Sequence, residues 1–270
     1  MQIGIMVRNM GPASQPAIIA ACARLAEEAG IDHLWVCDHI AIPREDAEGS
    51  GGRYLDPLAT LAFLAGVTGR IGLGVTVLIV PYRPALPTAK WVATVQELSQ
   101  GRLQLGVGVG WMAAEFRALG IARARRGALT DETLAFLNEC FAADEVELNG
   151  QRFLFLPRPT KPPVLVGGAG PHCFARIVRY GDGWMPMESD PAKLSAPIAE
   201  LRERLTAAGR TMPHVVPLGA LALEDRARAR ARLDELSAVG VTGFVHAARY
   251  STVDEFKVLV DKLMRATGDR

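Results

Sequence analysis

The sequence predicts an α/β protein of the (β/α)8 TIM-barrel class, and three observations lead to this prediction. Eight short apolar runs alternate with helical patterns, as parallel strands joined by helices do. The length of 270 residues is close to the roughly 250 that one such barrel needs. Apolar residues make up 49% of the chain and charged residues 22%, the balance of a globular protein with a large interior. We therefore expect a single domain over residues 1–270.

The expected strands are continuous apolar runs, which indicates that helices cover them. They lie at residues 3–7, 33–37, 71–80, 102–109, 163–168, 183–187, 214–223 and 243–248. Three of the helices between them have recognisable starts. Ser14 is the expected cap of the first, Asp190 begins another, and Thr252 with Glu255 has capping-box spacing before the last.

Three stretches lack the pattern of a buried strand or an amphipathic helix. Residues 43–56 are rich in glycine and charge, and residues 150–163 in proline and arginine. Because the loops after barrel strands build the active-site face, the first is predicted to be a mobile lid and the second an insertion, with ordinary surface loops as the alternative. The arginine-rich run 226–232 predicts a solvated helix, since its arginines spread around the axis and acidic residues flank it.

The charge balance points to a small-molecule partner. Thirty basic and 29 acidic residues give a net charge of +1, so no overall field favours nucleic acid or a membrane surface. No signal segment and no apolar run of roughly 18 residues is present, and we expect a cytoplasmic protein. The four cysteines form no CxxC motif and the five histidines are scattered, which favours reduced thiols and no metal site.

The first candidate for chemistry is the pair Asp38 and His39 at the end of the second expected strand. In a barrel this position lies at the mouth where catalytic groups gather. Histidine exchanges protons near neutral pH, and an adjacent carboxylate can orient an imidazole or bind a cofactor ring. The alternative is structural, with Asp38 capping the following turn.

Two glycine-rich segments are further candidates. Gly108, Gly110 and Ala113 match a dinucleotide-binding fingerprint with Asp131 downstream, but residues 126–137 predict a helix where that fold needs a strand. The glycines therefore indicate close approach of the backbone to a bound ring, with Trp111 as an apolar wall. The turn at residues 166–170 precedes a helix and predicts either a phosphate cradle or a simple tight turn.

Seven segments together resemble the luciferase-like monooxygenase superfamily. They are LWVCDHI (34–40), DPLATLAFLAG (56–66), RIGLGVTVLIVPYRP (70–84), GRLQLGVGVGW (101–111), EFRALGI (115–121), RGALTDETL (126–134) and RYGDGW (179–184). The resemblance covers roughly residues 3–190 in order. It looks closest to the branch that uses the deazaflavin coenzyme F420.

The resemblance implies a bacterial luciferase-like barrel whose mouth holds a flat flavin-like ring that exchanges a hydride. It implies that His39 is the proton donor or acceptor and that Asp38 contacts the ring. Thr76 and Val77 match a bulge with a non-prolyl cis peptide behind the ring. The other implied cofactor-binding residues are Gly108, Gly110 and Trp111 beside the ring, Gly167, Gly168, Ala169 and Gly170 around the phosphate, and Met187 at the sixth strand.

One position departs from the family pattern. Some deazaflavin dehydrogenases have a glutamate where this chain has Trp111, which disfavours a sugar-phosphate dehydrogenase mechanism. Glu115 is expected to face along its own helix. The resemblance then implies reduction of an unsaturated or carbonyl substrate, with His39 or water supplying the proton.

Several alternatives stay open at this point. The same fold can hold FMN in a monooxygenase, and a non-catalytic deazaflavin- or flavin-binding protein is the reading from a different class. The dinucleotide fingerprint leaves a nicotinamide-only dehydrogenase as a third. Homodimerisation is expected from apolar residues on the second and third helices, which can equally pack on the barrel: Leu58, Leu61, Phe63, Leu64, Trp91 and Val95.

Overall fold

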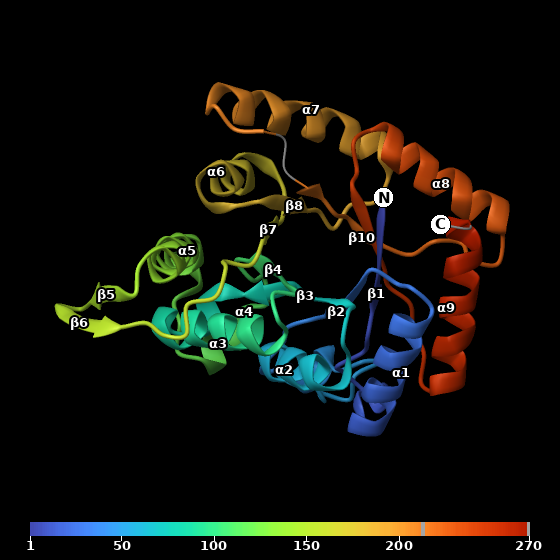
Figure 1. Ribbon diagram of the computed structural model, residues 1–270, viewed down its shortest axis with the longest axis horizontal. Coiled ribbons are helices and arrows are strands. Elements are labelled where there is room, and N and C mark those ends of the chain that lie inside the picture. Colours follow the sequence, from blue (N-terminus) through green and yellow to red (C-terminus); the bar gives the residue numbers. More distant parts are fainter. Residues whose placement is uncertain (212–213, 269–270) are drawn as a thin grey trace.

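The computed structural model describes residues 1–211 and 214–268 and has the expected barrel of parallel strands surrounded by helices (Figure 1). The strand order is β10-β11-β1-β2-β3-β4-β7-β8-β9. The bounds are β1 Gln2–Met6, β2 His33–Val36, β3 Gly72–Ile79, β4 Leu103–Gly108, β7 Val164–Gly167, β8 Gly183–Met185, β9 His214–Val215, β10 Leu218–Gly219 and β11 Gly243–His246. Every expected strand is present, most of them shorter than the apolar run that predicted it.

The barrel closes through the segment that was expected to be one strand over residues 214–223. It is divided into β9 and β10, because Pro217 between them has no N–H to donate to a ladder. β9 pairs with β8 and β10 pairs with β11. The Val216 N–H also donates to the Trp184 carbonyl at 2.9 Å, and the Pro217 carbonyl accepts from Val245 at 3.0 Å. One interrupted strand therefore bonds to both neighbours and completes the eight.

The helices cover the outside of the barrel. They are α1 Pro16–Glu28, α2 Pro57–Val67, α3 Ala85–Leu98, α4 Ala113–Ala118, α5 Arg126–Ala142, α6 Gly170–Tyr180, α7 Pro191–Ala207, α8 Arg226–Ala238 and α9 Val253–Thr267, with short 3-10 turns η1 Pro12–Ser14, η2 Arg44–Asp46, η3 Val80–Tyr82 and η4 Arg123–Arg125. The arginine-rich run forms α8 as predicted. Within the described part of the chain, no helix combines the length and apolar character needed to cross a bilayer.

Two of the three predicted helix caps are confirmed. Asp190 accepts from the Ala192 N–H, and Thr252 accepts from the Glu255 N–H. The cap at Ser14 is wrong, because Gln15 occupies the cap position of α1. The Ser14 hydroxyl instead donates to the Gly11 carbonyl at 2.6 Å inside the 3-10 turn η1. A competing local hydrogen bond has taken the side chain away from the helix.

A β-hairpin replaces part of the stretch that was expected to be an irregular insertion. β5 Glu145–Leu148 and β6 Gln151–Leu154 pair antiparallel and project from the side of the barrel (Figure 1). The turn residues Asn149 and Gly150 have φ angles of 52° and 77°. Asn-Gly is the preferred pair for a two-residue hairpin turn because both positions need positive φ. Asn149-Gly150 is therefore the sequence signal for this hairpin, although the proline and arginine content of the stretch suggested irregular structure.

The apolar faces of α2 and α3 are divided between core and surface. Leu58, Leu61, Leu64 and Val95 are buried against the barrel, whereas Phe63 and Trp91 are exposed. Four of the six residues expected at a dimer interface therefore belong to the core of one chain. Homodimerisation stays a prediction.

A bulge in β3 shapes the inside of the barrel. The pairing register with β4 shifts between Val75 and Leu78, and the Thr76–Val77 peptide is cis, as the resemblance implied. Glycines on the neighbouring strands make room for the bulge. A Cβ atom on Gly106 would collide with the Val75 carbonyl oxygen, and one on Gly108 would lie 2.5 Å from Val77 Cγ2. Glycine at positions 106 and 108 of β4 is thus a steric requirement.

We expect Gly106→Ala to lower the free energy of unfolding by at least 1–3 kcal/mol, because the added methyl group meets backbone that the bulge holds in place. Gly66→Ala in α2 is the matched control. It faces open space on an exposed helix position, so it should raise stability by about 0.5–1 kcal/mol. Urea unfolding measures both changes. Equal stability of the two variants would contradict the packing argument.

Candidate active site

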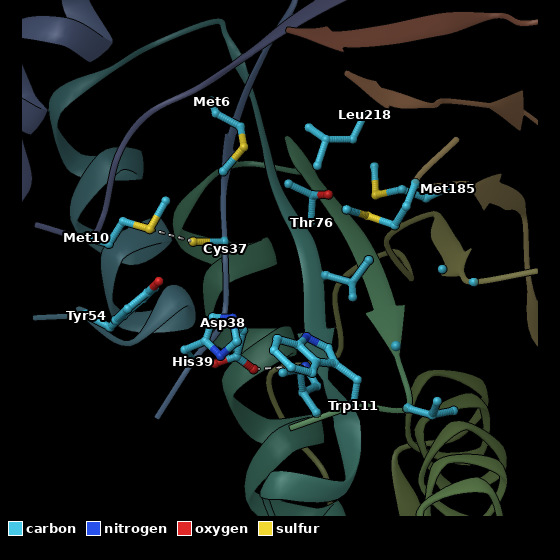
Figure 2. A pocket seen from close by; sticks show the side chains of 18 residues that line it. Met6, Met10, Cys37, Asp38, His39, Tyr54, Thr76, Trp111, Met185 and Leu218 are labelled. Carbon is cyan, nitrogen blue, oxygen red and sulfur yellow. Dashed lines mark hydrogen bonds between the residues drawn. The ribbon is translucent and has the colours of Figure 1, made fainter. Parts of the chain in front are cut away.

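A cavity of about 410 Å³ opens at the carboxyl ends of the strands (Figure 2). Ten of the twelve residues predicted from sequence line it: Asp38, His39, Thr76, Val77, Gly108, Gly110, Trp111, Gly167, Gly168 and Met187. They come from five different strands and the segments after them, and parallel strands bring such positions to one face. The other two, Ala169 and Gly170, lie at the start of α6 and do not line the cavity.

The floor of the cavity is the upper layer of the barrel interior. Met6, Met185, Leu218, Val77 and Cys37 belong both to the inner apolar cluster and to the lining. Figure 2 shows Met6, Leu218 and Met185 at one end and Asp38, His39 and Trp111 at the other. The cavity therefore has an apolar end and an end where proton chemistry is possible.

His39 is held by a buried carboxylate from α4. Glu115 is fully buried, and its Oε2 lies 3.0 Å from His39 Nδ1. The Tyr82 hydroxyl donates to the same oxygen at 2.7 Å. Glu115 Oε1 accepts from the N–H groups of Ile40 at 2.6 Å and Ala41 at 2.9 Å. Four donors thus converge on one carboxylate.

These donors keep Glu115 ionised. Burial raises its pKa, but the hydrogen bonds from His39, the two backbone N–H groups and Tyr82 outweigh burial and lower it to about 2. Burial, reinforced by the Glu115 hydrogen bond and charge, raises the pKa of Tyr82, so the hydroxyl remains a donor. Because an ionised carboxylate only accepts, His39 Nδ1 carries a hydrogen in this contact. Nε2 of a neutral His39 is then free to exchange a proton with a ligand.

The expectation that Glu115 faces along its own helix is wrong. α4 is only six residues long and packs beside the cavity, so its first turn directs Glu115 inward. The signal in the sequence was indirect: an acidic residue just before Phe116, a few residues after a glycine-rich strand. Spacing alone does not reveal that Tyr82 and the residues after His39 supply its donors.

Asp38 is paired with Arg83, and not with the neighbouring His39 imidazole. Its oxygens accept from Arg83 at 2.7 and 2.9 Å and from the Ile79 N–H at 2.8 Å. Arg83 also donates to Asp56 at 2.7 Å. Asp38 therefore does not orient the neighbouring imidazole, because its carboxylate is committed to Arg83 and β3. Its contact with a cofactor ring stays a prediction.

The loop over residues 43–56 contributes one wall of the cavity. The side chain of buried Asn9 ties it down, donating to the Cys37 carbonyl at 2.8 Å and the Leu55 carbonyl at 2.9 Å. Tyr54 lies next to this tie and lines the cavity, with its ring centroid 5.1 Å from that of His39. The carboxyl end of the loop is thus anchored to β1 and β2, which limits how far a lid could open there.

Several features of the cavity match a flat ring with a polar edge and a phosphate tail. The Thr76 hydroxyl is buried without a hydrogen-bond partner, which leaves it available to a ligand. A Cβ on Gly108 would collide with Val77 and one on Gly167 would lie a tight 3.0 Å from it, so backbone forms the wall there. Gly168 and Gly170 have φ angles of 109° and 76° at the start of the eleven-residue helix α6. Free N–H groups at such a start favour a phosphate.

The dinucleotide fingerprint does not correspond to a nucleotide-binding unit. Asp131 lies inside α5, where a Rossmann unit would have the end of a strand. Its carboxylate accepts from Arg176 on α6 at 2.6 Å. Asp131 is therefore not placed to bind the ribose of a dinucleotide, which disfavours a nicotinamide-only dehydrogenase. Over the described ranges, no group of three or more His, Cys, Asp or Glu side chains is arranged to hold a metal ion.

A sequence model of the luciferase-like monooxygenase family matches residues 1–264. The chain belongs to this family. A Mycobacterium tuberculosis protein described as uncharacterized is 32% identical over 265 residues, covering 90% of this luciferase-like chain and 92% of that protein. An F420-dependent hydroxymycolic acid dehydrogenase of the same organism is 33% identical over 229 residues, covering 79% of this chain and 61% of that protein.

Solved structures share the fold of this luciferase-like protein. A monooxygenase from Streptomyces bottropensis has a TM-score of 0.81 at 20% identity, covering 99% of this chain and 98% of that one. An F420-dependent secondary alcohol dehydrogenase in complex with an F420-acetone adduct has a TM-score of 0.77 at 18% identity. The match covers 97% of this chain and 98% of that one. A Pseudomonas putida diketocamphane monooxygenase in complex with FMN has a TM-score of 0.79 at 13% identity. The match covers 100% of this chain and 97% of that one. At these identities the likeness confirms the predicted fold class alone.

We expect Glu115→Gln to lower the free energy of unfolding by about 2–4 kcal/mol at pH 7, because a neutral amide cannot accept from all four donors. The folded pKa of about 2 lies below the ordinary 4.5, so the contribution of Glu115 is complete above about pH 4.5 and is lost as pH falls towards 2. The difference between wild type and variant should therefore shrink over that range.

Urea unfolding at pH 7 and pH 3 measures this effect. Glu97→Gln makes the same chemical change at an exposed position of α3 and should leave stability nearly unchanged at both pH values. A Glu115→Gln variant as stable as wild type at pH 7 would contradict the role assigned to the carboxylate.

Proposed function

We propose that this luciferase-like protein is an F420-dependent oxidoreductase that transfers a hydride between the deazaflavin ring and a small organic substrate. The observation that carries the proposal is His39, held by Glu115 at the wall of a largely apolar cavity at the barrel mouth. The relative named as an F420-dependent dehydrogenase, 33% identical over most of this chain, supports the deazaflavin in particular.

The residues around the cavity fit this cofactor. Val77, backed by Gly108 and Gly167, would support the ring, and the Thr76 hydroxyl would bond its polar edge. The turn from Gly167 to Gly170 would hold the phosphate through backbone N–H groups. When bound, a deazaflavin supplies or accepts a hydride at the ring carbon that corresponds to N5 of a flavin.

His39 would move the proton that accompanies the hydride. Its Nδ1 is bonded to Glu115, so Nε2 is the atom available to the substrate. In the reducing direction the substrate would gain a proton from His39 together with the hydride, the two-electron reductant that the bound cofactor would supply. Glu115 accepts from Nδ1 and so orients the imidazole for this transfer. We infer reduction of a carbonyl or conjugated alkene as the reaction type.

An FMN-dependent monooxygenase is the second candidate, favoured by the structural neighbour that holds FMN on the same fold. A ring-binding protein without turnover was motivated by Trp111 at a position where some relatives have an acid. The Glu115–His39 pair supplies an oriented proton carrier from other positions, which favours catalysis. The cofactor titration below separates the first two candidates.

We expect the protein to bind F420 at least tenfold more tightly than FMN, measured by fluorescence titration of each ring. Thr76→Val should weaken F420 binding by about 2–10-fold, because one hydrogen bond to the ring is lost. The same variant should leave the stability of the free protein unchanged or higher, since its hydroxyl has no partner there. Tighter binding of FMN than of F420 would contradict the choice of F420 and favour the FMN-dependent monooxygenase. Binding of neither ring would contradict the proposal.

Thr88→Val is the matched control for that experiment. The Thr88 hydroxyl is buried in α3 and donates to the Pro84 carbonyl at 2.8 Å, away from the cavity. Its loss should lower the free energy of unfolding by about 1 kcal/mol and leave the Kd for F420 unchanged. Thr76→Val is thus expected to weaken F420 binding without loss of stability, and Thr88→Val to lower stability without a change in binding.

We expect His39→Asn to lower kcat by about 100-fold or more with any substrate found, because the positioned proton carrier is removed. The Kd for the cofactor should change little, since the predicted ring contacts lie elsewhere. Single-turnover oxidation of reduced F420 with stopped-flow absorbance measures the rate. Full turnover by His39→Asn would remove His39 from the proposed reaction.

A further inference from the structure

The walls of the cavity carry almost no charge available to a ligand. Its lining contains no lysine and no arginine, and its single acidic residue, Asp38, is neutralised by Arg83. Arg83 in turn uses its guanidinium on Asp38 and Asp56. A charged substrate in this space would lose its hydration without gaining an ion pair to lysine or arginine, which is unfavourable.

Two further polar side chains of the lining, Cys37 and Tyr54, are neutral groups. Burial, assisted by the Asp38 charge, raises the pKa of the Cys37 thiol to about 12, and burial raises the pKa of Tyr54. The Cys37 sulfur also lies 3.8 Å from the Met10 sulfur, so thioether and thiol share one side of the cavity (Figure 2). Arg8 lies close behind this wall, donates to the Gly49 carbonyl at 3.1 Å and does not line the cavity.

Thioether and aliphatic groups dominate what is left. Met6, Met10, Met185, Met187 and Leu218 all line the cavity. Methionine has a flexible, polarizable side chain that adapts to apolar ligands of different shape. Such a wall gives affinity through buried apolar area and offers no hydrogen bonds to sugar or phosphate groups.

The mouth of the cavity is apolar as well. Trp111 is 64% exposed and Met187 is 70% exposed, although both are large apolar side chains. Ile40, directly after His39, is 46% exposed. Of these three, Trp111 and Met187 line the cavity, and exposed apolar side chains of this size at an opening are typical of a surface that an apolar ligand covers.

We propose that the substrate is an uncharged, largely apolar carbonyl or conjugated alkene compound, whose hydrocarbon part packs on the methionine-rich wall and whose reacting group faces His39. This inference rests on the proposed function for the reaction itself. Reduction adds a hydride from the reduced cofactor to the carbonyl or alkene carbon and a proton from His39 to the neighbouring oxygen or carbon. The substrate class follows from the lining alone.

The test compares straight-chain methyl ketones of five to nine carbons with keto acids of the same length, by isothermal titration calorimetry. Affinity for the ketones should rise about fourfold for each methylene, the fold-change that burial of one CH2 gives. Each keto acid should bind at least tenfold more weakly than its ketone. Keto acids that bind as tightly as ketones, or affinity independent of chain length, would overturn the inference.

A charge placed at the rim provides the second measurement. Met187→Lys adds a cation at an exposed position of the mouth, so it should weaken ketone binding and tighten keto acid binding by about fivefold or more. Val258→Lys on α9 adds the same charge at an exposed apolar position outside the cavity and should change neither. Equal effects of the two variants would show that the mouth does not select the ligand.

The two proposals fail in different ways. Titrations are made on the protein with F420 and without it. If F420 does not bind but ketones outbind keto acids, the proposed function fails and the substrate class stands. If F420 binds and the keto acids compete equally with ketones, only the substrate class fails.

Discussion

The site depends on a buried negative charge, Glu115, that forms no ion pair with a lysine or arginine of the described residues. An isolated carboxylate in an apolar interior is costly, and Glu115 is compensated by four donors from two other segments of the chain. The backbone after β2, the turn η3 and the helix α4 must therefore meet at one point. Because His39 is one of those donors, the requirement that satisfies the charge also fixes the imidazole.

A second constraint sets the shape of the cavity floor. The bulge in β3 turns Val77 towards the barrel mouth, and the neighbouring strands accommodate it with Gly106, Gly108 and Gly167. Each glycine removes a side chain that would otherwise fill the interior of a barrel. What remains is a space with backbone on one side and thioethers on another. The bulge thus explains why glycine occurs at alternate positions, 106 and 108, of β4.

Most of the fold and much of the site could be predicted from the sequence, because strand periodicity and glycine position are local signals. The eight apolar runs located the strands, and position at a strand end located His39 and Gly167. The partners of charged groups could not be predicted in this way. Glu115 and His39 are 76 residues apart, and only the closed barrel brings them together. Ser14 failed for the opposite reason, since two local hydrogen bonds competed for one hydroxyl.

The distribution of rigid and adaptable groups around the cavity has a chemical consequence. His39, Asp38 and Thr76 belong to strand ends or bonded networks, so their atoms are fixed with respect to the barrel. Met10 and Met187 lie on connections outside the strands and have flexible side chains. Under the proposed function, reaction geometry would depend on the first group and the fit of the substrate on the second. Substitutions at the methionines would then change the shape of the apolar end without displacing His39, because its bond to Glu115 is made at the other end of the cavity.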